Sequence, residues 1–323
     1  MSDCNQENSD LQNRGYPNPA AAVLAPRLMT MAIIMMLVFV VSVATAKAEE
    51  LQKENNIASD SSNWRFEFGP SGQLYPVYIA NPIRPQMGIA LAYFSESDIP
   101  NAGDERFIIR LGANVGFLRF SPTDKPGSGF QLNVEAGFIG AFDIESSLDN
   151  IGWDGLYGVL LTWSNGRGFA AQTGTKHVSS HVGDEYAERT GRKRINYTRN
   201  EYVLGLSLAG QKYWRVYGEG GYADDQRNKE LQEPWRLEAG LEFQDPHRFW
   251  DNRFGWYGAA DFNWYQESDW STDFTVQAGL IVVREKLFRT FRFGLEYRNG
   301  RSVLGEFFFR NETYISLGLW CDL

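Results

Sequence analysis

Apolar and polar residues alternate with a period of two along most of the chain after residue 49. In residues 107–117 the odd positions are apolar, and the even positions from Arg110 onward are polar or glycine. The same alternation occurs in residues 130–138, 235–243 and 291–297. It is typical of β-strands with one apolar and one polar face, whereas a sustained 3.6-residue apolar stripe is found nowhere in this region.

The length of the alternating segments favours a barrel that crosses a membrane. Strands of soluble sandwiches usually have about 5–6 residues, whereas strands of about 9–11 residues cross a bilayer, and closure leaves no unpaired edge in lipid. We therefore predict an all-β fold, an antiparallel transmembrane β-barrel of about 12 strands. A secreted lipocalin-like or sandwich fold is the alternative. The predicted spans are 86–94, 105–120, 129–142, 153–164, 168–181, 194–209, 213–222, 235–244, 254–265, 271–283, 289–299 and 313–321.

The connections fit an even-stranded barrel with both chain ends in the periplasm. Residues 165–167 and 210–212 are predicted to be tight inner turns, and residues 182–193, 223–234 and 300–312 to be longer outer loops. Tryptophans lie at many span ends, as in the aromatic girdles of membrane barrels. They are Trp153, Trp163, Trp214, Trp235, Trp256, Trp264, Trp270 and Trp320.

The sequence before the first span divides into two parts. Residues 1–48 are predicted to be a leader and signal peptide, because Arg27 precedes a short apolar run, 28–43, which small residues follow. An N-terminal anchor helix is the alternative. Residues 49–85 contain four prolines, too many for a central strand, and are predicted to be a periplasmic strap or a plug that enters the lumen. The barrel itself is assigned to residues 86–323.

Composition agrees with this assignment. The chain has 32 Gly and 15% aromatic residues, which suits strands and turns better than a helical bundle. Its net charge of −9 argues against nucleic acid as a partner. We expect a location in the bacterial outer membrane, with outer-membrane lipids and the barrel-insertion machinery as partners. A homodimer stays open as an alternative to a monomer.

Charges of both signs are predicted to face the lumen. Seven cations facing eight anions should pair into a hydrogen-bonded plug, whereas a selective pore would show a ring of one sign. A narrow small-solute channel is therefore kept as an alternative. The predicted inward residues are Arg110, Lys176, Arg199, Arg215, Arg236, Arg292 and Arg298, with Glu135, Glu201, Glu219, Glu238, Glu242, Asp261, Asp273 and Glu296.

One group of polar residues is predicted to lie on the outside. Charged residues on the lipid face cost up to about 2–4 kcal/mol, so Arg199 and Glu201 should point inward, which turns Asn196 and Asn200 outward. In the preceding span the same parity turns His177 and Ser179 outward. Nine steps of about 3.3 Å from the start of that span, tilted by roughly 40°, climb about 23 Å of an apolar band about 25 Å tall. His177 is thus expected near the outer rim, where lipid ester bonds lie.

Antiparallel pairing should bring these residues together. A serine, a histidine and an asparagine in contact can act as nucleophile, base and orienter of the imidazole. This His-x-Ser motif on an outward-facing rim resembles the motif of outer-membrane phospholipase A, a calcium-dependent acyl hydrolase, and more faintly that of lipid A deacylases. The resemblance implies Ser179 as nucleophile, His177 as base, and Asn196 or else Asn200 as orienter.

The resemblance to the phospholipase ends directly after the serine. The phospholipase continues with Asn-Gly, whereas Ser180 and His181 follow here. This departure affects the residues that would form the oxyanion hole and the calcium site. Asp184 and Glu185 are the nearest candidate calcium ligands in the sequence.

Nearly the whole mature chain resembles an uncharacterised bacterial family assigned to outer-membrane barrels. The likeness covers the proline-rich entry at 74–85, the motif His-Val-Ser-Ser-His-Val-Gly-Asp-Glu-Tyr at 177–186, and the segments 300–302 and 305–308. It implies a fold and a location but no activity. We therefore predict an outer-membrane barrel of unassigned molecular activity. Lipid acyl-ester hydrolysis is one alternative, and a structural or ligand-gripping role of the motif, with His177 turned inward by a β-bulge, is another.

Overall fold

The computed structural model describes residues 64–125, 127–210, 213–226, 231–245, 249–250, 253–284 and 289–322. The predicted leader and signal peptide, residues 1–48, and residues 49–63 of the predicted strap lie outside this described part. No helix within the described residues is long and apolar enough to cross a membrane.

Thirteen strands and three short helices make up the described chain. The strands are β1 Trp64–Phe68, β2 Met87–Ser97, β3 Glu105–Pro122, β4 Ser128–Asp143, β5 Asp149–Asn165, β6 Phe169–Val182, β7 Thr198–Gly210, β8 Trp214–Gln226, β9 Trp235–Gln244, β10 Phe254–Tyr265, β11 Thr272–Arg284, β12 Arg289–Arg301 and β13 Asn311–Asp322. The helices are α3 Asp184–Thr190, η1 Gln266–Ser268 and η2 Gly305–Phe307.

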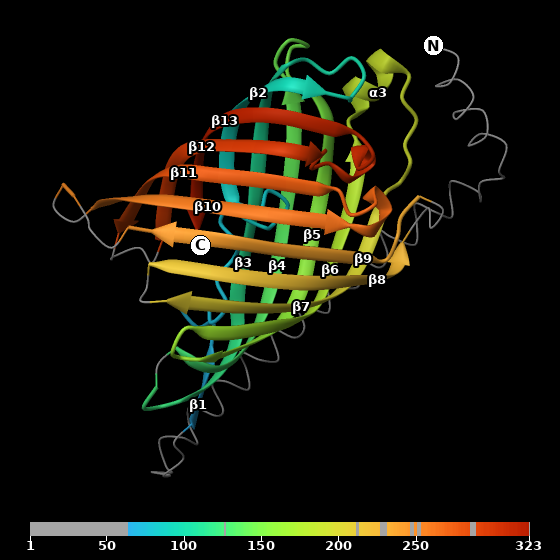
Figure 1. Cartoon of the computed structure of the whole chain (residues 1–323). Coiled ribbons are helices and arrows are strands. Elements are labelled where there is room, and N and C mark those ends of the chain that lie inside the picture. The colour runs from blue at the N-terminus through green and yellow to red at the C-terminus, as the bar shows by residue number, and fades with distance from the viewer. Residues whose placement is uncertain are drawn as a thin grey trace. The chain divides into compact units, whose positions relative to one another are not determined.

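Strands β2 to β13 form a closed antiparallel barrel of 12 strands, as predicted (Figure 1). Each strand pairs with the next one in the chain, and β13 closes the ring by pairing with β2. The observed strands match the predicted spans in order and differ mainly at their ends. The short helices α3, η1 and η2 were not predicted, and neither was the five-residue β1, which pairs with the end of β3.

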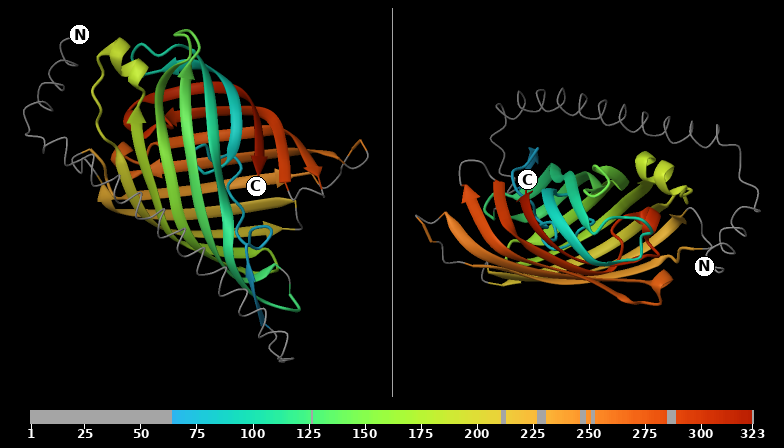
Figure 2. Two further views of the ribbon diagram at one scale, coloured as in Figure 1. Left: turned by 180° about the vertical axis from the view of Figure 1, so that it is seen from behind. Right: turned by 90° about the horizontal axis from the view of Figure 1, so that it is seen from above.

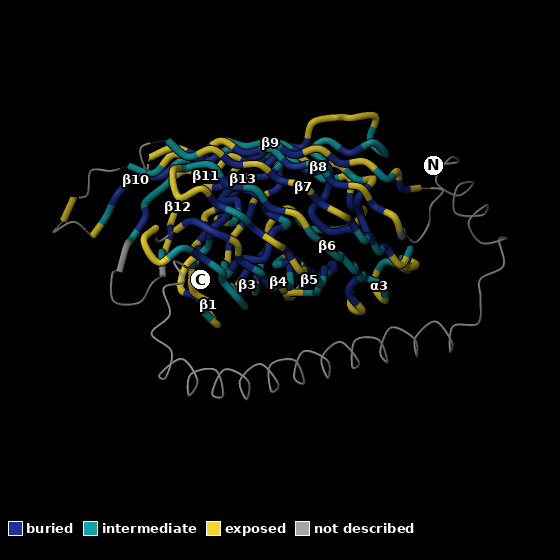
Figure 3. The backbone as a smooth tube through the Cα atoms, turned by 90° about the horizontal axis from the view of Figure 1, so that it is seen from below, coloured by how far each residue is buried: buried dark blue, intermediate teal, exposed yellow. Residues whose placement is uncertain are grey.

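Buried and exposed residues alternate along the strands of the wall (Figure 3), and this alternation separates charged side chains on the inside from apolar ones on the outside. In β7, Leu204 is 61% exposed on the outside, whereas Glu201 is 7% exposed on the inside. An exposed apolar belt on a closed barrel suits a lipid surrounding. All the residues that were predicted to face the lumen point inward, and the prediction is confirmed.

We call the rim that holds the turn 166–168 and the end of β13 the turn rim, and the opposite rim the loop rim. The connections at the loop rim pack into a small apolar core. Tyr186 of α3, Leu304 and Phe307 are buried there against Ile151. The Tyr186 hydroxyl also donates a hydrogen bond of 2.5 Å to the carbonyl oxygen of Pro100. The loops at this rim are therefore fixed in place by burial.

Residues 70–86, which we call the plug segment, run within the curve of the strands (Figure 2). The backbone N–H of Ile79 donates to Glu242 at 2.7 Å, and the Asn81 amide donates to Glu238 at 2.7 Å. The Arg84 guanidinium donates to Glu219 at 2.6 Å and to Glu238 at 2.9 Å. Carboxylates of the barrel wall thus hold the plug segment inside the lumen.

We expect the purified barrel to show no unit conductance in planar bilayers. The plug segment is hydrogen-bonded across the lumen, and a cavity beside it, lined by residues of the wall, has a volume of only about 90 Å³. Single-channel recording of the chain from residue 49 onward checks this. Regular unit openings above the leak of protein-free bilayers would instead support the channel alternative.

Candidate active site

Three neighbouring strands bring the polar outward residues together near the loop rim. His177 of β6 pairs in register with Asn200 of β7 and with Tyr157 of β5. Ser179 pairs with Thr198. Alternate residues of β6 point the other way, and Ser180 and Val182 are each 1% exposed inside the barrel. His177, Ser179 and Asn200 therefore share the outward face, on the side of the wall that carries the apolar belt.

Asn200 fixes the orientation of the His177 ring. The Nδ1 atom of His177 lies 2.5 Å from Oδ1 of Asn200, and the imidazole stacks on the Tyr157 ring with a centroid distance of 4.3 Å. Because an amide oxygen only accepts hydrogen bonds, this contact requires the hydrogen on Nδ1. Nε2 is then the basic nitrogen of the ring, which is the tautomer a general base needs.

Ser179 contacts the other histidine of the motif. Its Oγ lies 3.2 Å from Nε2 of His181, and the His181 ring stacks on Trp153 with a centroid distance of 4.2 Å. Across β5, Ser179 faces Gly155, which has no side chain to cover the hydroxyl. The nucleophile candidate thus lies between two imidazoles, one on each side along the same strand face.

The inward residues of the same motif anchor the strand to the loop that contains η2. Ser180 donates a hydrogen bond to Asp154, and the backbone N–H of Glu306 donates to Ser180 Oγ at 2.8 Å. The backbone N–H of Gly305 donates to Asp154 at 2.9 Å. Ser180 and Asp154 thus bind the η2 loop on the lumen side of the wall. These hydrogen bonds hold the register of the outward residues on the other side.

Glu306 ties the same loop to the segment before β7. Its carboxylate accepts hydrogen bonds from the backbone N–H groups of Ile195, at 2.9 Å, and Tyr197, at 3.3 Å. Burial raises the pKa of Glu306 above its usual range, and these N–H groups oppose that rise. The start of β7, and with it Asn200, is therefore positioned from the lumen side.

Asn196, the first choice as orienter, does not lie beside His177. It is exposed in the connection before β7, with a left-handed φ of 54°. The structure joins His177 to Asn200, which the strand parity had given as the other choice. A two-residue alternation cannot be extended through a left-handed residue, because such a residue turns the chain out of the strand.

Asp184 and Glu185 do not form a calcium site with the other candidate residues. Both are exposed in the first turn of α3, and the Asp184 carboxylate pairs with Arg194 at 2.9 Å. Within the described ranges, no group of three or more His, Cys, Asp or Glu side chains could hold a metal ion. These two residues by themselves do not supply the six to eight oxygen ligands that calcium takes.

A comparison with protein families assigns the chain. Residues 41–322 match the family described as protein of unknown function, DUF1207. The chain belongs to this family. The predicted membership of an uncharacterised family is confirmed, and no curated protein sequence matches this DUF1207 chain.

Solved structures of outer-membrane barrels resemble the DUF1207 chain in fold. Outer membrane phospholipase A from Escherichia coli superimposes with a TM-score of 0.51 at 12% identity, over 76% of this chain and 93% of the other. The Salmonella typhi outer membrane phospholipase, solved as a dimer with bound calcium, gives a TM-score of 0.53 at 11% identity, over 79% and 94%. At these identities the likeness concerns the fold, which is that of outer-membrane β-barrels.

His181 was not predicted to belong to the outward group of residues. The signal was present, since position 181 has the same parity as positions 177 and 179. Strand parity does not determine in which direction along the strand the Ser179 hydroxyl points. That direction depends on a side-chain rotamer.

Proposed function

We propose that this protein hydrolyses acyl esters of membrane lipids at the outward face of its loop rim. One observation carries the proposal, namely that Asn200 orients the His177 imidazole on the lipid-side face two residues from Ser179. The fold of outer-membrane barrels supports a location in the bacterial outer membrane, with the loop rim outward and lipids as the partners of this face. The barrel-insertion machinery would be the partner during assembly.

Ser179 would attack the ester carbonyl carbon through Oγ. Its proton passes to Nε2 of His177, and the imidazolium is held by the Nδ1–H contact to Asn200. The C–O bond to the lipid alcohol then breaks, and the alcohol takes the proton from His177. A water molecule, deprotonated by the same ring, then releases the fatty acid from Ser179.

This chemistry requires a rotation of the serine side chain. The Ser179 hydroxyl contacts His181 in the structure and must turn about χ1 toward His177, a change between staggered rotamers. His181 would hold the hydroxyl in the resting state.

Covalent labelling tests whether Ser179 is an activated nucleophile. We expect a fluorophosphonate probe to modify the folded barrel at Ser179, because a serine beside a base reacts far faster than an ordinary hydroxyl. Peptide mapping by mass spectrometry locates the label. Ser179→Ala should remove it, whereas Ser95→Ala, which changes an exposed serine of β2 that donates to the Thr313 carbonyl, should leave it unchanged. The absence of label at Ser179 in the folded protein would refute the proposed nucleophile.

A further inference from the structure

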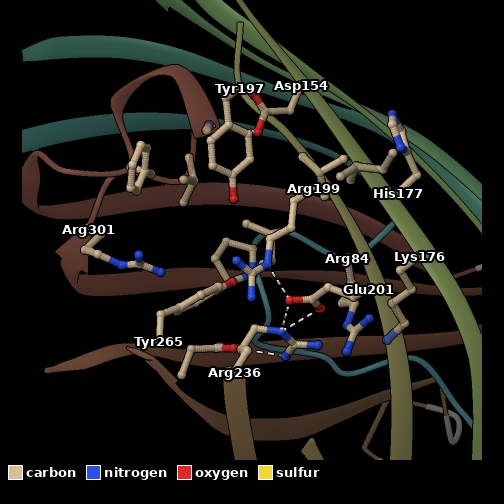
Figure 4. Close-up of a pocket in the computed structure, with 18 of the residues that line it drawn as sticks. Arg84, Asp154, Lys176, His177, Tyr197, Arg199, Glu201, Arg236, Tyr265 and Arg301 are labelled. Atoms are coloured by element: carbon tan, nitrogen blue, oxygen red, sulfur yellow. Dashed lines mark hydrogen bonds and ion pairs between the residues drawn. The ribbon is translucent and has the colours of Figure 1, made fainter. Parts of the chain in front are cut away.

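A chamber lies inside the barrel between the plug segment and the η2 loop (Figure 4). The side chains of Arg84, Lys176, Arg199, Arg236 and Arg301 extend toward a common space in this view. The chamber has a volume of about 90 Å³, which corresponds to six to nine spheres of about 10–15 Å³, the volume that holds one water molecule. This space suits a small organic molecule.

Most cations around the chamber are neutralised by the barrel wall. Arg236 donates to Glu201 at 2.9 Å, and to Glu219 and Glu238 at 2.6 Å each. Arg301 pairs with Asp273 at 3.0 Å. These paired groups would shape a ligand site, and their charges need no further counter-ion.

Arg298 differs from the other chamber cations. It is 5% exposed and lines the chamber, and it donates to Thr275 Oγ1 at 3.0 Å and to the Arg301 carbonyl at 2.7 Å. Among the residues that the structure describes, no carboxylate lies within ion-pair distance of it, and its Nε is buried with no hydrogen-bond partner. A buried guanidinium without a counter-ion is costly, and its planar fork suits a carboxylate.

Glu135 also lines the chamber, and its carboxylate can accept further hydrogen bonds. It is 5% exposed, and within the described chain its carboxylate accepts one hydrogen bond, from the Asn114 amide at 3.2 Å. A carboxylate offers about four acceptor positions, so it would bind further donors such as hydroxyl groups. The rings of Tyr197, Tyr265 and Phe308 also line the chamber and offer flat surfaces to a compact body.

We propose that the chamber binds a small hydroxylated carboxylic acid of about the size of glycerate. Its carboxylate would meet Arg298, and its hydroxyl groups would donate to Glu135. This site lies on the lumen side of the wall and does not depend on the proposed hydrolysis at Ser179. It assigns a binding role to charged residues that the outward site does not use.

Calorimetric titration of the folded chain from residue 49 onward in detergent tests the proposal, with D-glycerate as the probe. We expect saturable binding of glycerate, and binding at least tenfold weaker for glycerol, which lacks the carboxylate, and for inorganic phosphate, which lacks the hydroxylated body. Arg298→Gln should weaken glycerate binding at least tenfold, because a charge-assisted hydrogen bond is lost. Arg292→Gln is the matched control, since Arg292 is a buried inward arginine of the same strand that pairs with Asp322 outside the chamber, and it should bind as the wild type does.

Other outcomes separate this proposal from the enzyme. Ser179→Ala should bind glycerate as tightly as the wild type, whatever its effect on lipids. If Arg298→Gln does not fold, Glu135→Gln provides the second variant and should also weaken binding. No binding of glycerate to the folded wild type, or phosphate binding as tight as glycerate binding, would overturn the assignment.

Discussion

His177→Ala is expected to lower the rate of fatty-acid release from phospholipid micelles by at least about 10³-fold, whereas His181→Ala should lower it by less than about tenfold. The reason is the hydrogen bond between His177 Nδ1 and Asn200 Oδ1, which sets the tautomer and supports the imidazolium. His181 contacts Ser179 at 3.2 Å, but the described structure shows no such orienter on its ring. The measurement is the initial rate of release by folded protein, with each variant compared at equal concentration.

Asn200→Ala completes this set of variants. It should slow release by less than His177→Ala does, because it removes the orienter and leaves the base. Asn196→Ala should have no effect, since Asn196 is exposed in the connection before β7. A large loss for His181→Ala together with a small one for His177→Ala would reassign the base to His181.

Arg84→Ala should lower the free energy of unfolding by about 3–5 kcal/mol, the usual cost of leaving buried charges without their partner. Arg84 is buried in the plug segment and pairs with Glu219 and Glu238, whose side chains are fully buried. Its removal also frees the plug segment from one wall of the lumen. Urea unfolding in detergent, followed by tryptophan fluorescence, measures the change.

Arg65→Ala is the control for Arg84→Ala. Arg65 also lies in the N-terminal part of the described chain, but its side chain is 56% exposed and its pair with Glu67 is 3.8 Å long. Exposed ion pairs contribute about 0–1 kcal/mol, so this variant should unfold almost as the wild type does. Equal losses for Arg65→Ala and Arg84→Ala would contradict a plug held by buried ion pairs.

The barrel could be predicted because a lipid-facing strand must alternate at every second residue. Arg199 and Glu201 alone determined the parity of β7, since either charge would be costly on the lipid side. β1 and α3 could not be predicted in this way. β1 has five residues beside prolines, and α3 has seven residues, of which Tyr186 is the buried one, so neither gives a periodic signal.

The chemistry of the outward face was predicted only in part. Parity placed His177, Ser179 and Asn200 on one face, and register alone brought His177 opposite Asn200. The contact between Ser179 and His181 depends on a rotamer, and the exclusion of Asn196 depends on a left-handed residue. Neither the rotamer nor the left-handed residue produces a periodic pattern in the sequence. The ion pairs of Arg84 likewise depend on how the plug segment lies in the lumen.

Fatty-acid release by the folded wild-type barrel, compared with Ser179→Ala, tests the central claim most directly. The substrate is a diacyl phospholipid in mixed micelles, with and without added calcium, and mass spectrometry identifies the products. We predict fatty acid and lysophospholipid from the wild type and at least about 10³-fold less from Ser179→Ala. Equal release from both proteins, or none from the wild type under either condition, would contradict the account.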